Sequence, residues 1–446
     1  MNDDTPLERC DLLIVGAGPA GMAAAVAAAP SGARIVLIDD NPAPGGQIWR
    51  SGPHAGPPLR ARRLRDALAR CANVRVCSAT RVAAAPAPGH LLLEDARRGW
   101  LMRYAKLILC TGARELLLPF PGWTLPGVTG AGGLQALAKA GLPLAGERIV
   151  VAGSGPLLLA AAATATRAGA TVLRVAEQAP PGELARFAVH LVRWPGKAAQ
   201  AVTLARATYR TRSHVLAATG DGRVESVRLR RGDGTTEEIA CDRVANGYGL
   251  VPNTELGQLL GCRVAPRHGT PALAVDADQR TSLADVHAAG ECTGIGGSER
   301  ALVQGSMAGS RAVGLAAQAD ALRPALARWD AFAERLHRCF ALDDALRALS
   351  TPDTLVCRCE DVPHAALAGR RGWVDAKLHT RCGMGACQGR VCGAATQFLF
   401  GWTPPEPRPP LFPVRVSTLA IPFPVPGPLS VPVPSPLPQA ADRPGD

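Results

Sequence analysis

The feature that most constrains this chain is a glycine pattern set between an apolar segment and an alanine-rich segment. Asp11–Val15 is predicted to be a buried parallel strand, Met22–Ala29 a helix, and the turn between them carries Gly16, Gly18 and Gly21. Glycines at these spacings permit a tight turn, a close approach of the backbone to a ligand, and close packing of the helix on the strand. The pattern therefore predicts an α/β fold with a parallel sheet.

An acidic residue follows at the distance that a dinucleotide site requires. The next predicted strand, Arg34–Ile38, ends at Asp39, which lies 18 residues after Gly21. The start of the helix offers N–H groups and a positive dipole end to a pyrophosphate, and the carboxylate binds the adenosine ribose. The residues predicted to bind a cofactor here are Gly16, Gly18, Pro19, Ala20, Gly21 and Asp39.

A second unit of the same kind begins near residue 148. The predicted strand Arg148–Ala152 is followed by Gly153 and Gly155, and an acid, Glu177, ends the next strand. The third glycine position is taken by Leu158, whose side chain pushes the helix from the strand or crowds the pyrophosphate. A nucleotide fold is therefore predicted, but Leu158 disfavours NAD(P), and whether another nucleotide binds there stays open.

Composition excludes several classes of protein. The 446 residues correspond to two to four domains at roughly 100–200 residues each. A hydrophobic fraction of 47% excludes a mostly disordered chain. The net charge of +12 comes from scattered arginines, since only four of the 49 basic residues are Lys, and aromatic residues make up only 4%. We therefore expect no nucleic-acid partner.

The sequence also predicts where the protein works. Met1–Asp4 is acidic where a signal peptide would be basic, so we expect no export. Leu12–Ala33 and Ile149–Thr166 carry no charge, but each contains a Gly-x-Gly turn, which is typical of a buried strand and helix rather than a membrane span. We expect a cytoplasmic protein without a transmembrane segment, associated with a membrane only through its partners.

Five of the thirteen cysteines lie within 36 positions near the C-terminus. In a reducing compartment such crowding indicates a metal site rather than disulfides. The Cys357-x-Cys359 spacing is unusual for structural zinc, the runner-up, and favours a [2Fe–2S] cluster, whose irons need four thiolates. Spacing alone leaves the choice of ligands open, because Cys382 and Cys387, and also Cys387 and Cys392, are separated by four residues.

Four stretches resemble the two-dinucleotide-binding-domain flavoproteins, the glutathione and thioredoxin reductase superfamily: Gly16–Asp39, Pro44–Gln47, Leu109–Arg114 and Ala288–Cys292. The resemblance implies FAD in the first module, although Glu291 stands where the family has an Asp that holds the ribityl chain. The further FAD contacts it implies are Gly45, Gly46, Gln47, Thr111, Gly112, Gly290 and Glu291. A dithiol reductase is disfavoured, because the first two modules contain no cysteine pair with the spacing of that class.

The region from about Val356 to Gly393 resembles the bacterioferritin-associated-ferredoxin type of [2Fe–2S] domain. The shared motif is Cys-Arg-Cys-Glu, followed by Thr-Arg-x-Gly-Met-Gly-x-Cys-Gln-Gly-x-x-Cys. The resemblance implies that the metal ligands are Cys357, Cys359, Cys387 and Cys392. Cys382 falls on a variable position of the motif and is interpreted as a spare thiol.

The order of these modules resembles the A (alpha) subunits of opine oxidases and of D-hydroxyproline and proline dehydrogenases, and the B subunit of hydrogen cyanide synthase. This resemblance implies an FAD- and [2Fe–2S]-containing electron-transfer subunit of a heteromeric amino- or imino-acid dehydrogenase. Electrons would enter from a smaller FAD-dependent, amine-oxidase-like beta subunit, then leave to a quinone or other carrier. No catalytic residue is expected, because Arg114 and Arg300 suit surface or phosphate-neutralising roles better than substrate binding.

The predicted architecture is an α/β chain with two Rossmann-like dinucleotide-binding domains, a small helical [2Fe–2S] domain and a Pro-rich C-terminal arm. The FAD domain is expected at residues 8–125 and 265–330, the degenerate NAD(P)-type domain at 126–264, the [2Fe–2S] domain at 351–400 and the arm at 401–446. The arm holds 15 of the 39 prolines, which excludes regular helices and interior strands.

Two other functions stay open from the sequence. The first is a stand-alone NAD(P)H-dependent iron–sulfur flavoprotein reductase, against which Leu158 argues. The second is a redox-sensing binding module, which only Cys382 suggests.

Overall fold

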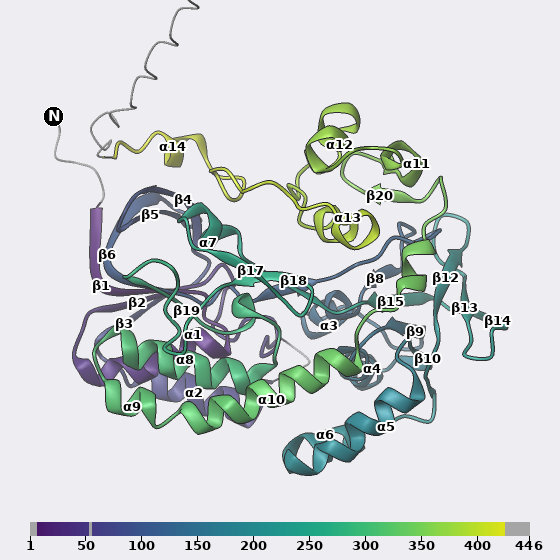
Figure 1. Cartoon of the computed structure of the whole chain (residues 1–446), viewed down its shortest axis with the longest axis horizontal. Coiled ribbons are helices and arrows are strands. Elements are labelled where there is room, and N and C mark those ends of the chain that lie inside the picture. The colour runs from purple at the N-terminus through teal and green to yellow at the C-terminus, as the bar shows by residue number, and fades with distance from the viewer. Residues whose placement is uncertain (1–6, 53–55, 424–446) are drawn as a thin grey trace, which may run out of the picture.

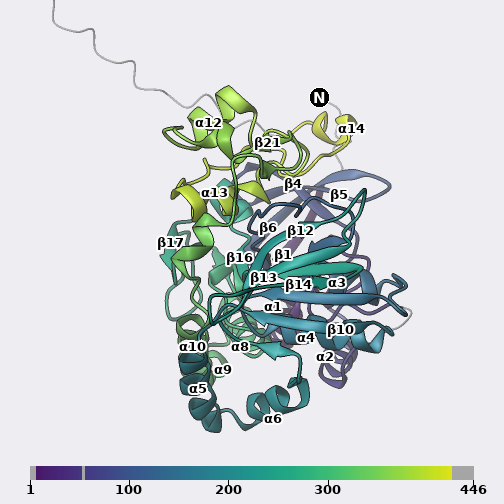
Figure 2. The ribbon, with the colours of Figure 1, turned by 90° about the vertical axis from the view of Figure 1, so that its right-hand side faces the viewer.

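A computed structural model of the protein describes residues 7–52 and 56–423, so the acidic N-terminus and the tail beyond residue 423 lie outside the described residues. Two α/β modules lie side by side, and a small third domain sits over the second module and the junction between the two (Figure 1, Figure 2). The α/β class and the two Rossmann-like modules predicted from the glycine patterns are therefore confirmed.

The first module is built on a seven-stranded sheet in the order β3-β2-β1-β6-β5-β4, with β19 paired to β6. Its centre is parallel, because β1 (Leu7–Val15) lies between β2 (Ile35–Ile38) and β6 (Gly99–Leu109). The remaining strands are β3 (Val74–Cys77), β4 (Arg81–Ala87), β5 (His90–Glu94) and β19 (Val286–Ala288). The helices of this module are α1 (Pro19–Ala28), α2 (Leu59–Ala69), α7 (Glu255–Leu259), α8 (Ser298–Ala312) and α9 (Ala316–Asp320), and a hairpin of β17 (Val264–Arg267) and β18 (Thr270–Leu273) completes it.

The second module repeats this plan with a five-stranded parallel sheet in the order β11-β10-β9-β15-β8. Its strands are β8 (Val128–Gly130), β9 (Arg148–Gly153), β10 (Thr171–Glu177), β11 (Tyr209–Arg210) and β15 (Arg243–Gly247). Its helices are α3 (Ala131–Lys139), α4 (Leu157–Arg167), α5 (Pro181–His190) and α6 (Pro195–Leu204). An antiparallel sheet of β12 (His214–Thr219), β13 (Ser226–Arg230) and β14 (Thr236–Ala240) packs beside it.

The chain crosses between the first two modules twice, and the strands that make the two crossings pair with each other. β7 (Ala113–Glu115) leaves the first module and runs antiparallel to β16 (Leu250–Pro252), which returns to it. Helix α10 (Arg323–Cys339) then runs along the lower side of the molecule in Figure 1 and leads to the third domain. This domain has its own small core and consists of β20 (Leu355–Cys357), β21 (Val362–Pro363), α11 (His364–Leu367), α12 (Trp373–Thr380) and α13 (Cys392–Phe400).

The Pro-rich arm is laid over the first module. After α13 it runs along the top of the molecule to the β4–β5–β6 strands, where the amide of Leu411 donates to the carbonyl of Ala83 (Figure 1). Arg415 and Thr418 both hydrogen-bond to the carboxylate of Glu94. The expectation that the arm contains no helix is wrong at one place, because a single-turn helix, α14 (Val416–Leu419), forms in a stretch that contains no proline.

The two uncharged stretches form buried strand–helix units, β1 with α1 and β9 with α4, as predicted. Over the part of the chain that the structure describes, no helix combines the length and the apolar character needed to span a bilayer.

The packing of α8 on α1 depends on two glycines. A Cβ at Gly305 would lie 2.1 Å from the carbonyl oxygen of Ala20, and one at Gly309 would lie 2.2 Å from that of Ala24. Contacts this short cannot exist between a side chain and a helix backbone. The backbones of α1 and α8 are therefore in direct contact at these two glycines.

Gly305→Ala is accordingly expected to lower the free energy of unfolding by about 1–3 kcal/mol, the usual cost of overpacking a core. The matched control is Gly182→Ala in α5, because no atom lies within 4 Å of a Cβ placed there. Alanine at that position should leave the melting temperature unchanged or raise it slightly, since alanine favours a helix over glycine by about 0.5–1 kcal/mol. Equal melting temperatures for the two variants would contradict this account of the α1–α8 contact.

Candidate functional site

The first glycine turn has no room for side chains. Gly16 has a φ of +102°, and a Cβ there would lie 2.2 Å from the carbonyl oxygen of Cys110. A Cβ at Gly21 would lie 1.7 Å from the carbonyl oxygen of Gly16. Helix α1 begins at Pro19, directly after Gly18, and within residues 7–52 and 56–423 no side chain caps it. Its N-terminal N–H groups and dipole therefore face the space where a pyrophosphate would bind.

The predicted flavin loop lies directly over this helix start. The amide of Gly45 donates to the carbonyl of Ala17, and Gly46 has a φ of +57°. A Cβ at Gly46 would lie 2.9 Å from the Cα of Gly18. Two residues without side chains thus face each other at the mouth of the turn, which suits a ligand that approaches the backbone.

Asp39 lies where a ribose-binding acid is needed. It is buried at the end of β2, and it accepts hydrogen bonds from the amide of Ala17 at 2.5 Å and from the amide of Asn41 at 2.8 Å. The carboxylate is thereby fixed beside the glycine turn. The geometry of turn, helix start and acid fits a dinucleotide.

The other predicted flavin contacts converge on the same edge of the sheet. Thr111 and Gly112 follow the end of β6, and Gly290 and Glu291 follow the end of β19, which is parallel to β6. The carboxylate of Glu291 accepts hydrogen bonds from the amides of Gly296 at 2.9 Å and Gly297 at 2.8 Å, next to the start of α8. Strand ends that meet in this way form the ligand-binding edge of a parallel sheet.

The second glycine turn keeps the first two glycine positions of the first turn but not its backbone, because Gly155 has a positive φ whereas Gly18 has a φ of −70°. Gly153 and Gly155 have φ values of +138° and +101°, and Glu177 accepts a hydrogen bond from the amide of Gly155 at 2.8 Å. Burial raises the pKa of Glu177 to about 7, although hydrogen bonds from the amides of Ala179 and Gly155 oppose the shift. Leu158 is fully buried in the core between α4 and the sheet, so its side chain fills the contact that the third glycine makes in the first turn.

A segment of the chain itself covers this second turn. The linker after α10, residues 340–343, runs over the ends of β9 and β10. The hydroxyl of Ser154 donates to the carbonyl of Phe340 at 3.1 Å, and the amide group of Gln178 donates to the carbonyl of Ala341 at 2.9 Å. The amide of Asp343 donates to the side-chain oxygen of Gln178 at 3.2 Å. No sequence pattern indicates this cover, because it depends on contacts between residues 163 to 186 positions apart.

The sequence predicts a surface or a phosphate-neutralising role for two arginines. Arg300 is 2% exposed and binds Asp330 and the carbonyl of Gly294, so the surface alternative is wrong for this residue. Arg114 is half-buried at the junction of the modules, where it contacts Glu255 and the third domain. The phosphate-neutralising alternative stays a prediction for both residues.

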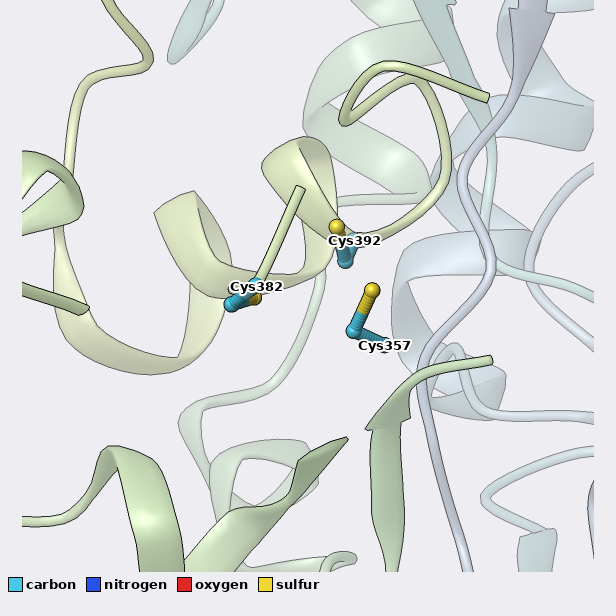
Figure 3. A group of neighbouring side chains, drawn as sticks. All are labelled: Cys357, Cys382 and Cys392. Carbon is cyan, nitrogen blue, oxygen red and sulfur yellow. The ribbon is translucent and has the colours of Figure 1, made fainter. Parts of the chain in front are cut away.

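The thiols of the third domain lie together. The Sγ atoms of Cys357, Cys382 and Cys392 are all within 4.8 Å of one another, and the three residues are buried (Figure 3). Cys357 ends β20 and Cys392 begins α13, so the two halves of the sequence motif meet as expected. Cys382, interpreted from the sequence as a spare thiol, is part of this group.

The two other predicted ligands lie next to the group. Cys387 is half-buried and its sulfur accepts hydrogen bonds from the thiols of Cys392 and Cys359, while Cys359 is exposed. Hydrogen bonds from Cys382 and Cys392 lower the pKa of Cys357 to about 2, and the donor Cys382 has its pKa raised to about 12. Soft thiolates in this number fit a cluster of iron and sulfide, and the structure provides five thiols for four positions.

Comparison with known proteins places the chain in a family. It belongs to the pyridine nucleotide-disulphide oxidoreductase family, whose sequence pattern it matches over residues 10–312. It is therefore an oxidoreductase, and membership of this family implies FAD as the cofactor.

Particular relatives are similar over most of the chain. The A subunit of the opine oxidase of Agrobacterium tumefaciens is 34% identical over 86% of this chain and 84% of its own length. The hydrogen cyanide synthase subunit HcnB of Pseudomonas aeruginosa is 32% identical over 91% of this chain and 97% of its own. The crystal structure of L-proline dehydrogenase from P. horikoshii shares the fold with a TM-score of 0.70 at 18% identity, covering 94% of this chain and 81% of that one.

Asp39→Asn is expected to weaken FAD binding about tenfold or more, because a charged hydrogen-bond acceptor contributes about 1.5–3 kcal/mol. The matched control is Asp40→Asn, which makes the same change of charge at an exposed neighbouring position. Flavin retained after dialysis, measured by absorbance and by fluorescence of the released cofactor, checks the result. Equal flavin retention in both variants would show that Asp39 does not contact the ribose.

Proposed function

We propose that this chain is the FAD- and [2Fe–2S]-containing electron-transfer subunit of a heteromeric amino- or imino-acid dehydrogenase of opine, D-hydroxyproline or proline type. The observation that carries the proposal is the contrast between the two glycine turns. Within the described residues no side chain caps the helix that follows the first turn, whereas residues 340–343 cover the second turn. Electrons would therefore enter from another protein rather than from NAD(P)H.

The relatives support a partner subunit. The opine oxidase relative and HcnB are both subunits by name, and this chain matches each over most of its length. The proposed partner is the smaller FAD-dependent, amine-oxidase-like beta subunit, where the C–N bond would be oxidised. The proposed acceptor is a quinone or another carrier.

The residues of this chain would hold the two cofactors. Bound FAD can take up two electrons and pass them on singly, and a [2Fe–2S] cluster carries one electron at a time. The turn at Gly16–Gly21 would hold the pyrophosphate, Asp39 the ribose, and Glu291 would lie toward the ribityl chain. The domain limits that we propose are residues 8–125 with 265–330 for FAD and 351–400 for the cluster.

One observation favours a second candidate, a stand-alone NAD(P)H-dependent reductase. The bond of Glu177 to the amide of Gly155 repeats that of Asp39 to the amide of Ala17, so the second turn keeps the elements of a nucleotide site. NAD(P)H could use them only if the linker of residues 340–343 moved away.

Anaerobic mixing with NADH or NADPH separates the two functions. Under the proposed function the flavin absorbance of the purified chain stays unchanged for minutes after a tenfold excess of either nucleotide is added, and the chain alone does not oxidise proline, D-hydroxyproline or opines with a dye acceptor. Dithionite serves as the control that the flavin can be reduced. Bleaching by NAD(P)H within seconds would establish the reductase instead.

For the cluster we propose the ligands Cys357, Cys359, Cys387 and Cys392. Serine variants of Cys357 and Cys392 should lose iron and acid-labile sulfide, because these two thiols belong both to the proposed ligands and to the buried group of three. Cys71→Ser, outside the domain, is the control and should keep them. Cys382→Ser should keep both, and Cys359→Ser should lose them; the reverse pattern would put Cys382 in the place of Cys359.

A further inference from the structure

The segment that leaves the first module, residues 113–123, contacts both halves of the thiol-rich domain. We call it the connector. At its end, the indole Nε1–H of Trp123 donates to the carbonyl of Leu355 at 2.6 Å, two residues before Cys357. Arg358, which stands between Cys357 and Cys359, lies over the Trp123 ring at 5.1 Å. The connector thereby fixes β20, the strand that ends at the first thiol, Cys357.

Near its start, the connector reaches the second pair of proposed ligands. The guanidinium Nε of Arg114 donates to the carbonyl of Arg390 at 3.0 Å. Arg390 belongs to the four-residue loop between Cys387 and Cys392, and its own amide donates to the carbonyl of Cys387. One arginine of the first module is therefore bonded to the backbone of the metal loop.

The same guanidinium is also connected to Thr111 in the first module. Its Nη1 donates to the side-chain oxygen of Asn253 at 2.8 Å. Asn253 is in turn bonded to Thr111, because its side-chain amide donates to the Thr111 carbonyl at 2.9 Å and its own carbonyl accepts from the Thr111 hydroxyl at 2.6 Å. Thr111 is one of the predicted flavin contacts.

We propose that Arg114 is a positioning residue for electron transfer, which holds the Cys387–Cys392 loop at a fixed place relative to Thr111, a predicted FAD contact. This inference rests on the proposed function of the chain. Three hydrogen bonds make up the path between Thr111 and this loop. They join the Thr111 carbonyl to the Asn253 side chain, the Asn253 side chain to the Arg114 guanidinium, and the guanidinium to the Arg390 carbonyl.

The chemistry of arginine suits this role. Its planar guanidinium donates in several fixed directions at once, whereas a lysine donates from a single point. Glu255 lies 2.7 Å from Nη1 and offsets the charge of a half-buried guanidinium. The guanidinium joins the two domains through one rigid, planar group, and rigid support of this kind keeps the separation of two sites fixed.

The test is Arg114→Gln in the full-length chain loaded with both cofactors. Flavin, iron and sulfide per chain should stay at the wild-type amount, since the variant touches no ligand. The rate of flavin-to-cluster electron transfer after rapid photoreduction should fall about tenfold or more. Hydrogen exchange of the amides in residues 388–393 should become faster, because the loop loses its attachment. Arg114→Lys should recover part of the rate.

Two controls separate this role from general stability and from charge. Arg243→Gln removes another half-buried arginine, which pairs with both carboxylate oxygens of Glu147 and not with the thiol-rich domain, and should leave the transfer rate unchanged. Glu255→Gln changes the local charge but keeps the bond to Arg390, and should retain most of the rate.

A wild-type transfer rate together with unchanged exchange in Arg114→Gln would overturn the positioning role while the proposed function stands. If wild-type protein prepared anaerobically contains no iron or sulfide, the proposed function itself fails. Loss of iron in Arg114→Gln but not in Arg243→Gln would overturn the path and assign Arg114 to holding the cluster loop instead.

Discussion

The structure depends on the absence of side chains where β1 turns into α1. Gly16 and Gly21 lie so close to neighbouring carbonyl oxygens that a Cβ at either position would overlap them, at 2.2 Å and 1.7 Å. Only this contact lets α1 point its N-terminus at the edge where β1, β6 and β19 end together. The helix start, the acid at the end of β2 and the later strand ends at Thr111 and Glu291 all take their positions from that edge.

The two α/β modules share one plan but differ at their glycine turns. Each turn has its first glycine at positive φ and an acid bonded to a turn amide, but Gly155 has a positive φ and Gly18 does not. Leu158 fills the helix–strand contact of the second module, and residues 340–343 lie over its turn, held by Ser154 and Gln178. The second module thus keeps the fold while another part of the chain rests on it.

Sequence reasoning predicted what local pattern determines and missed what distant contacts determine. The first turn, Asp39, the second turn and the crowding of cysteines all follow from spacing along the chain, and the structure places them as expected. The linker over the second turn, the burial of Arg300 and the contact of Arg114 with Arg390 join residues far apart, for which no spacing rule exists. Cys382 is intermediate: its spacing to Cys387 left the ligand choice open, and the structure then brought its sulfur within 4.8 Å of those of Cys357 and Cys392.

Under the proposed function the two cofactor sites need a fixed separation. In the described residues the crossing strands β7 and β16 are one of several connections between the two modules, because Lys197 of α6 pairs with Glu299 of α8 and Lys139 of α3 donates to the carbonyl of Ile48. The third domain adds further attachments. Its first strand is bonded to Trp123, its Cys387–Cys392 loop to Arg114, and the arm that follows it is bonded to Glu94 on the far side of the first module. Arg390 joins two of these attachments, since its guanidinium also donates to the carbonyl of Leu411 in the arm. Attachments at three separate places determine the orientation of a small domain more fully than any one of them could. The described part of the Pro-rich arm, residues 401–423, therefore has a mechanical role, because this mostly extended segment reaches from the third domain across to the first module and bonds there.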